Sequence, residues 1–463
     1  MFDVKIYSKR REILKKRMKT GLLLFPGNEE SPMNYSANGY RFRQDSTFLY
    51  YFGLNEPGLA AVMDLDSDQE ILFGNDLDMD DIIWMGYLPG MAEKCRKVGV
   101  SYHRPLSQLP DFLAAVVKQG RKIHFLPPYR AEHYLNLSNL LGIDTSSVMS
   151  YASEEFIRAV VAQRSIKSKE EIKHIEEALA TTHDMHVTAM RKTRPGIREC
   201  DLAGEVEGIA LAAGGTVAFP VILSVQGEIL HNHYHGNRLK SGQLVVNDSG
   251  AESGMGYAGD ITRTFPVSGK FTPRQADIYS IVLKAQLEAI RAIRPGKKYL
   301  EIHKKVSRII AQGLKEVKLM KGNVEDAVNQ GAHALFFPHG LGHMLGLDVH
   351  DMENLGESYV GYDAGTKRSG QFGLAYLRLA RELQPGFVLT VEPGIYFIPA
   401  LINKWMMEKK FREFINYQKV HEYLKFGGIR IEDNVLVTAG GGRVLGKPIP
   451  KQIGELENIV GTA

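Results

Sequence analysis

The sequence predicts a two-domain protein, an α/β domain over residues 1–164 followed by an α+β domain over residues 165–463. The chain has 463 residues, and single hydrophobic cores usually stop growing near ~250–300 residues. In the first part, short apolar runs alternate with turn residues and helical stretches, which is typical of α/β domains. In the second part, long helices occur among strands without strict alternation, which favours α+β with a mostly antiparallel sheet.

The first domain is expected to form a sheet from five short apolar runs. Each run is bounded by turn residues, and a helical stretch, DFLAAVVKQG, precedes the last of them. In chain order the runs are GLLLFPG, FLYYFGL, AAVMDLDS, QEILFG and KIHFLPP. A basic stretch at 9–19 has apolar residues at helical spacing, and we interpret it as a solvated helix face.

Three long helices are expected in the second domain. Ser168 and Glu171 have capping-box spacing before a long periodic body that stops at the Pro-Gly pair of 195–196. Thr272 caps a second helix, with proline in its first turn and glutamine at the box position. The third covers roughly 299–320.

Four predicted strands of the second domain carry carboxylates. A buried strand normally holds none, because an unpaired charge away from water costs several kcal/mol. A single one could be a strand-end acid capped by backbone amides. Four acids that converge would repel one another and need a cation, and oxygen-rich clusters with one imidazole suit manganese, iron, cobalt or zinc. The strands, with their acids, are 243–250 (Asp248), 260–269 (Asp260), 387–397 (Glu392) and 427–438 (Glu432).

Two histidine-rich stretches are further candidates for a site. PHGLGHMLGLDVHD at 338–351 contains His339, His343 and His350. It could form a metal site, supply a catalytic base, or be a turn-rich core segment, and its glycines argue against a long helix. In HNHYH, starting at His231, alternate histidines would share one strand face, so a three-imidazole zinc site is an alternative to the carboxylate site.

Composition excludes several classes of function. The net charge is +4 and no long segment concentrates one sign, so neither nucleic acid nor an acidic membrane surface is an expected partner. Two distant cysteines form no disulfide framework or thiolate metal site. The N-terminus is charged where a secretory signal would be apolar, and no run approaches the ~18 apolar residues of a membrane span. We expect a cytoplasmic protein.

Four longer motifs resemble the signature blocks of one enzyme family. GYAGDITRTFPVSGKFT, HGLGHMLGLDVHD, LTVEPGIYF and GGIRIEDNVLVT are similar to blocks of the Xaa-Pro aminopeptidase and prolidase family, dinuclear metallopeptidases of the pita-bread fold. The resemblance covers about 165–440, and YRFRQDSTFLYYFGLNEPG at 40–58 is similar to the aminopeptidase P version. It implies a pita-bread (creatinase/aminopeptidase-like) catalytic domain preceded by a smaller α/β creatinase-type N-terminal domain.

The resemblance also implies a ligand set for two divalent metal ions. Asp248 would bind one metal, Asp260 and Glu432 would bridge both, and His343 and Glu392 would complete the second. Mn²⁺ is the expected ion, with Zn²⁺, Co²⁺ or Fe²⁺ as alternatives. Two such ions, about 3.5–4 Å apart, turn a bridging water into hydroxide near neutral pH.

Further residues match pocket positions of the family. Glu392 resembles the general base, and His231, His339 and His350 resemble histidines that line the pocket and stabilise the reacting carbonyl. Arg430 would orient an acidic ligand by a hydrogen bond.

Two departures from the family pattern bear on the substrate. Asp248 and Asp260 are twelve residues apart rather than the usual eleven, and we expect a longer hairpin loop to absorb the extra residue. The segment between Glu392 and Glu432 is long, as in prolidases. Arg378 matches the arginine that holds the dipeptide carboxylate there, although it could instead be a surface charge.

The implied function is that of an Xaa-Pro aminopeptidase, which releases the residue before proline from proline-containing peptides. An Xaa-Pro dipeptidase is the near alternative, and a metal-free creatinase-like hydrolase or a non-catalytic protein would lack this ligand set. The relatives imply a homodimer or homotetramer. Trp84 resembles a tryptophan that can approach a neighbouring subunit's site, although it could equally be an ordinary exposed or core residue.

Overall fold

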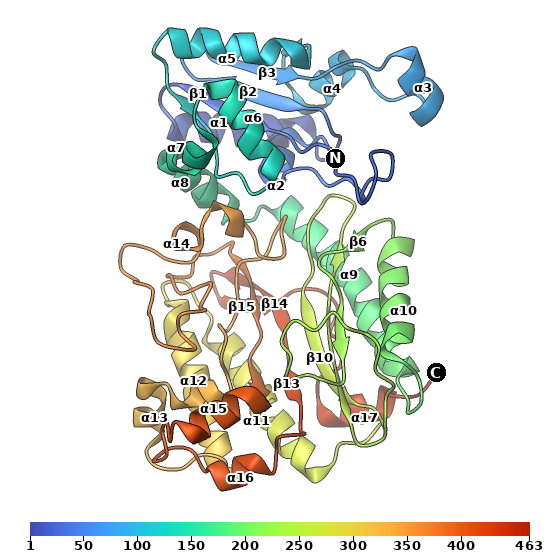
Figure 1. Cartoon of the computed structure of the whole chain (residues 1–463), viewed down its shortest axis with the longest axis vertical. Coiled ribbons are helices and arrows are strands. Elements are labelled where there is room, and N and C mark those ends of the chain that lie inside the picture. Colours follow the sequence, from blue (N-terminus) through green and yellow to red (C-terminus); the bar gives the residue numbers. More distant parts are fainter. The chain divides into compact units, whose positions relative to one another are not determined.

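The computed structural model describes all 463 residues and divides them into two compact units (Figure 1). The first unit comprises Met1–Arg164 together with the short segment Asn354–Tyr359. The second comprises Ser165–Glu353 and Val360–Ala463. The chain therefore returns once to the first unit after the histidine-rich stretch.

The first unit is built on a five-stranded mixed sheet with the order β4-β3-β2-β1-β5. The two central pairings are antiparallel and the two outer ones parallel. Apolar residues from β1, β2 and β3 form a core with α5 and α6. The strands are β1 (Leu22–Pro26), β2 (Ala60–Asp64), β3 (Gln69–Phe73), β4 (Tyr102–Arg104) and β5 (Ile123–His124). FLYYFGL, expected as a strand, is instead the short helix α2, in which Asp45 accepts a hydrogen bond from the amide of Phe48.

Eight α-helices accompany this sheet: α1 (Val4–Arg17), α2 (Ser46–Phe52), α3 (Met79–Met85), α4 (Met91–Val98), α5 (Leu109–Lys118), α6 (Ala131–Leu141), α7 (Val148–Tyr151) and α8 (Glu154–Arg164). The basic stretch lies on α1, but its interpretation as a solvated face is wrong for Arg10 and Arg11, which are buried. The guanidinium of Arg11 donates to Glu70 and to three backbone carbonyls, so its charge and its donors are satisfied away from water.

Helix α3 buries none of its residues. Trp84 is 86% exposed, and the neighbouring large apolar side chains are also exposed: Met79, Ile83, Met85 and Tyr87. Figure 1 shows α3 at the end of the unit, joined by extended segments. Trp84 is thus an exposed residue within this chain.

Two helices of the second unit begin at the predicted caps. The hydroxyl of Ser168 caps α9 (Lys169–Lys192) in a capping box with Glu171, and Thr272 and Gln275 do the same for α11 (Pro273–Ala292). The third predicted helix is α12 (Tyr299–Glu316). The remaining α-helices of this unit are α10 (Glu199–Ala212), α13 (Val324–Gln330), α15 (Pro399–Met407), α16 (Tyr417–His421) and α17 (Ile453–Ile459). Helix α14 (Glu357–Val360) has all but its last residue in the Asn354–Tyr359 segment of the first unit.

The strands of the second unit pair only antiparallel, which agrees with the predicted α+β class. Two three-stranded sheets, β10-β8-β7 and β11-β14-β15, and two pairs, β12-β13 and β6-β9, make up this part. Helix α9 packs against β8, and α11 packs against β11 and β15. The strands are β6 (Thr216–Val217), β7 (Ile222–Ser224), β8 (Leu244–Ser249), β9 (Ala251–Glu252), β10 (Ile261–Pro266), β11 (Val388–Val391), β12 (Gly394–Tyr396), β13 (Gly428–Arg430), β14 (Asp433–Thr438) and β15 (Gly441–Val444).

Two strands predicted as continuous are each broken at a carboxylate. The run at 387–397 divides into β11 and β12 around Glu392, and the run at 427–438 divides into β13 and β14 around Glu432. Strand β11 pairs with β14 and β12 with β13, so the two breaks lie opposite each other. The sequence pattern missed the breaks because the apolar residues continue on both sides.

The structure contains no helix with the length and apolar character needed to cross a bilayer.

Candidate active site

Asp248 and Asp260 lie on the same face of one antiparallel pair. Asp248 on β8 is opposite Thr262 on β10, and Asp260 comes two residues before Thr262. Because side chains alternate along a strand, both carboxylates point to one side. The register holds through the last pair before the loop, Ser249 with Ile261, so the longer loop absorbs the extra residue as expected. At Gly250 a Cβ would lie 1.8 Å from the carbonyl oxygen of Gly259, so only glycine fits there.

His343 is held by hydrogen bonds on both its backbone and its ring. Its amide donates to the hydroxyl of Thr390 at 3.0 Å, and its carbonyl accepts from the amide of Thr390. Its Nδ1 lies 3.0 Å from the carbonyl oxygen of Met344, which can only accept, so Nδ1 carries the proton. The lone pair of Nε2 therefore faces the neighbouring carboxylates, as a metal ligand requires.

The side chains of Glu392 and Glu432 extend from the two strand breaks toward His343 and Asp260. His343 Nε2 lies 3.6 Å from Glu392 Oε1 and 3.3 Å from Asp260 Oδ2. Glu432 is buried, and its Oε2 accepts a 2.7 Å hydrogen bond from the hydroxyl of Thr262. A break frees each carboxylate from strict alternation, so both can turn toward His343.

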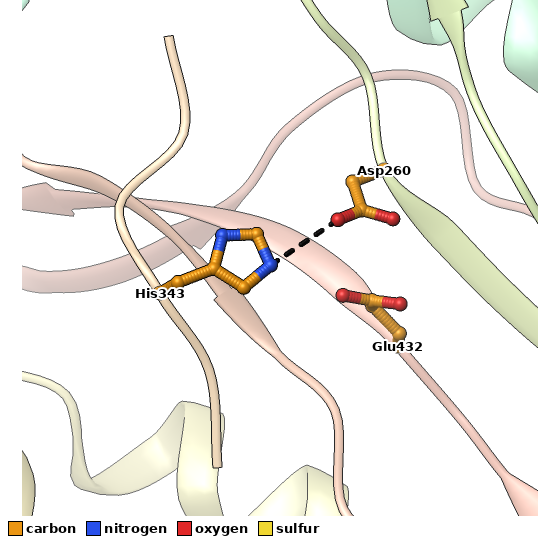
Figure 2. Close-up of side chains that lie close together, drawn as sticks. All are labelled: Asp260, His343 and Glu432. Atoms are coloured by element: carbon orange, nitrogen blue, oxygen red, sulfur yellow. Dashed lines mark ion pairs between the residues drawn. The ribbon is translucent and has the colours of Figure 1, made fainter. Parts of the chain in front are cut away.

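Asp260, His343 and Glu432 form the tightest group, with ligand atoms all within 4.8 Å of one another. Figure 2 shows the three side chains converging from three separate segments of the second unit, with the ion pair between His343 and Asp260 drawn as a dashed line. Of the five ligands implied by the sequence, the structure thus brings three into one group. Glu392 lies against His343, and Asp248 lies one strand away.

Two buried oxygens of this cluster have no hydrogen-bond partner: Asp248 Oδ1 and Glu432 Oε1. Leaving a buried charged acceptor unsatisfied is costly, so such atoms call for an explanation. A divalent cation supplies one, because it would accept these oxygens as ligands and offset the repulsion among the acids. Four carboxylates and one neutral imidazole fit the harder and borderline divalent metals.

The raised pKa values of the acids also fit such a site. Burial raises the pKa of Asp260 to about 8, and the charge of Asp248 adds to the effect. Burial raises the pKa of Glu392 to about 7, with His343 opposing and Asp260 reinforcing the shift. Burial and the charges of Asp260 and Glu392 raise the pKa of Glu432 well above its usual range. Clustered carboxylates in a dry setting thus retain protons unless a cation replaces them.

Arg430 links the acids to a histidine through a tyrosine. Its guanidinium donates to Asp248 Oδ2 at 2.5 Å, to the hydroxyl of Thr262 at 3.1 Å, and to the hydroxyl of Tyr396 at 2.9 Å. The Tyr396 oxygen lies 2.9 Å from His339 Nε2, while His339 Nδ1 donates to the carbonyl of Gly340. Since Nδ1 carries the proton, Nε2 accepts from Tyr396. His339 would have to release Tyr396 and gain a proton at Nε2 before it could donate to a substrate oxygen.

His350 belongs to a second series of side-chain contacts. Its ring centroid lies 4.3 Å from that of His343. Its Nδ1 lies 2.5 Å from Glu353 Oε2, and Glu353 Oε1 lies 3.3 Å from Arg378 Nε. Arg378 is therefore joined to His350 by a carboxylate that no sequence motif indicated.

His231 lies in a turn between β7 and β8, not on a strand, so the expectation that HNHYH forms a strand face is wrong. The residue as a whole is exposed, its ring is partly shielded from solvent, and the ring makes no hydrogen bond to the protein. His235 Nε2 bonds the carbonyl of Val221, and the three histidines do not form a ligand group, so the three-imidazole alternative has no support. The buried carboxylate of Glu199 holds this loop by accepting from Ser224 and from the amide and side chain of Asn237.

Sequence reasoning missed Tyr396, Glu353 and Glu199. Tyr396 stands in LTVEPGIYF four residues after Glu392, and a phenol near a cluster of acids is a recognisable signal. Glu353 follows His350 by three residues, but the sequence alone does not distinguish it from any other acidic residue in a loop. Glu199 gave no signal, because its partners lie in a loop distant in sequence.

Comparison with known proteins assigns the family. Residues 173–439 match metallopeptidase family M24, and residues 7–124 match the aminopeptidase P N-terminal domain. The chain belongs to metallopeptidase family M24, as the motifs suggested.

Similar proteins span nearly the whole chain. The Xaa-Pro aminopeptidase of Escherichia coli is 33% identical, covering 98% of this chain and 97% of that protein. The human Xaa-Pro dipeptidase is 31% identical, covering 94% and 88%. The structure of zinc-substituted E. coli aminopeptidase P in complex with product has a TM-score of 0.81 at 31% identity, covering 99% of this chain and 98% of that one. Proline aminopeptidase P II from Yersinia pestis gives 0.82 at 31% identity, with 99% of each covered. The predicted fold class is confirmed.

Proposed function

We propose that this chain is an Xaa-Pro aminopeptidase that removes the N-terminal residue preceding proline, with two divalent metal ions as cofactors. The observation that carries the proposal is the convergence of buried carboxylates on the free nitrogen of His343. It is supported by the likeness to E. coli aminopeptidase P over nearly the full length of both chains. In this proposal, the smaller first domain ends at residue 164 and the catalytic second domain begins at residue 165.

The proposed ligands divide between two metal positions. Asp248 would hold one ion, His343 and Glu392 would hold the other, and Asp260 and Glu432 would be shared by both. When bound, the pair supplies Lewis acidity and a water activated for attack near neutral pH. We propose Mn²⁺ as the ion, because four carboxylates and one imidazole suit it. Zn²⁺, Co²⁺ or Fe²⁺ would fit the same donors.

The chain's own side chains then handle protons and charge. Glu392 is placed to take the proton from the attacking water and pass it to the proline nitrogen as that nitrogen leaves. His231, His339 and His350 are proposed to donate hydrogen bonds to the substrate as negative charge develops on the scissile carbonyl oxygen. Arg430 holds Asp248 in position. A dedicated site is needed because the Xaa-Pro bond is a tertiary amide without an N–H.

An Xaa-Pro dipeptidase is the second candidate. The 31% identity with the human Xaa-Pro dipeptidase favours it, as does the long segment between Glu392 and Glu432 that contains α15 and α16. The contact of Arg378 with Glu353 weighs against it, because the arginine that would hold a dipeptide carboxylate already faces an acid.

Hydrolysis of defined peptides tests the proposal. Metal-stripped protein resupplied with Mn²⁺ is given an Xaa-Pro dipeptide and an Xaa-Pro-Xaa tripeptide, with Glu392→Gln as the inactive control. Release of the first residue from the tripeptide, lost in Glu392→Gln, supports the aminopeptidase. Cleavage of the dipeptide alone supports the dipeptidase. If the metal-loaded protein cuts neither, the proposed function is wrong.

We further propose a homodimer or homotetramer in the cytoplasm. The exposed apolar side chains of α3, including Trp84, favour association, because contiguous exposed apolar residues mark interaction surfaces. Light scattering on the purified protein measures the state of assembly.

A further inference from the structure

Glu353 contacts a histidine and an arginine of the candidate site at once. Its Oε2 lies 2.5 Å from His350 Nδ1 and its Oε1 lies 3.3 Å from Arg378 Nε. The side chain is 38% exposed, so solvent and small molecules can reach the group. Glu353 thus places one carboxylate oxygen against the guanidinium of Arg378.

Arg378 faces the candidate site. Burial is the largest cause of the lowered pKa of His231, His339, His343 and His350, and the positive charge of Arg378 contributes to each. The guanidinium therefore lies where its field reaches all four imidazoles. A forked cation beside a peptide site is a natural partner for a substrate carboxylate.

A carboxylate already on that guanidinium changes which substrates fit. An Xaa-Pro dipeptide carries a free carboxylate directly on its proline, whereas a longer peptide carries a neutral amide there. Pairing with Glu353 offsets the charge of Arg378, and a second carboxylate beside Glu353 would be repelled. A neutral amide meets no such penalty.

We propose that Glu353 is a specificity-determining residue that occupies Arg378 and thereby selects peptides that continue beyond proline over Xaa-Pro dipeptides. This inference rests on the proposed function and specifies its substrate class. It requires only that proline's carbonyl end lies toward Arg378.

The test compares ligands that differ only in this charge. An Xaa-Pro dipeptide and its C-terminal amide have the same size, so their KM ratio separates charge from length. For the native protein we expect a lower KM for the amide. In Glu353→Gln, which keeps the size of the side chain and one oxygen that can accept from Arg378, KM for the free acid should fall about fivefold, as for a partly exposed charge pair. KM for the amide should not fall in parallel, so the ratio of the acid KM to the amide KM should drop by about the same factor.

Glu382→Gln is the matched control. It makes the same chemical change four residues from Arg378, at an exposed side chain without a hydrogen bond or ion pair in the structure. It should leave the acid-to-amide ratio at the native value. A native preference for the free acid, or an equal ratio in Glu353→Gln and native protein, overturns the inference.

Binding of products gives a readout that needs no turnover. Calorimetry on the metal-loaded protein compares proline with prolinamide, in native protein and in Glu353→Gln. The inference requires that proline gain affinity in the variant while prolinamide does not. If the native protein cuts no peptide, the proposed function fails, and this comparison still decides whether Glu353 opposes a carboxylate at Arg378.

Discussion

Arg430 Nη2 donates a 2.5 Å hydrogen bond to Asp248 Oδ2 across 182 residues of sequence, and both side chains are buried. The contact leaves Asp248 Oδ1 without a partner and fixes its direction. A ligand carboxylate oriented in this way presents one oxygen to a metal with little loss of side-chain entropy.

Arg430→Lys should weaken metal binding about 10–100-fold, the usual cost of losing a residue that orients a ligand. A lysine cannot reach Asp248, Thr262 and Tyr396 with one planar group. Calorimetric titration with Mn²⁺ measures the affinity. Arg443→Lys, on the exposed strand β15, is the control. Native affinity in Arg430→Lys would show that Asp248 needs no such support.

Metal binding should release protons. Without metal, the pKa of Asp260 is raised to about 8 and that of Glu392 to about 7, so at pH 7 these acids hold about one proton or more between them. A cation displaces that proton, and its affinity should fall as the pH is lowered. Calorimetry in two buffers of different ionisation enthalpy counts the protons. A count of zero would mean that the acids are already ionised without metal.

Lys167→Met should lower the stability of the second unit by about 3–5 kcal/mol, because it leaves the carboxylate of Asp351 buried without its cation. Each side chain of this pair is 1% exposed, and Nζ lies 2.7 Å from Oδ2. The double variant Lys167→Met with Asp351→Leu should recover most of the loss. Denaturation followed by the fluorescence of Trp405 measures both. Equal losses in the single and double variants would contradict this account.

Removing the imidazole of His303 should reduce the acid sensitivity of the protein. Burial lowers the pKa of His303 to about 3, and neither ring nitrogen has a hydrogen-bond partner. Between pH 6.5 and pH 3 the unfolded chain binds a proton that the folded chain excludes, so stability falls as the pH falls, by roughly 1.4 kcal/mol per pH unit for this group.

The measurement is the melting temperature of His303→Leu relative to native protein from pH 7 to pH 4.5. The melting temperature of the variant should rise relative to that of the native protein as the pH falls. His421→Leu, at an exposed position, should show no such trend. A pH-independent difference for His303→Leu would mean that the buried ring already carries its proton.

Local sequence was sufficient to predict the long helices of the second unit and the acids of the site. The caps at Ser168 and Thr272 were predictable because a capping box depends on residues three apart. Acids in apolar runs marked Asp248, Asp260, Glu392 and Glu432, because a buried strand tolerates a charge only with a partner.

Tertiary structure decided how these residues meet. The breaks at Glu392 and Glu432 arise where β11 and β12 pair with β14 and β13, a match that no local pattern contains. Burial of Arg11 depends on carbonyls 40 and 87 residues away, and the links from Arg430 through Tyr396 to His339 join three separate segments. Periodicity specifies which face of an element is apolar, whereas long-range hydrogen bonds and the electrostatic field of a cluster exist only once distant segments have packed together.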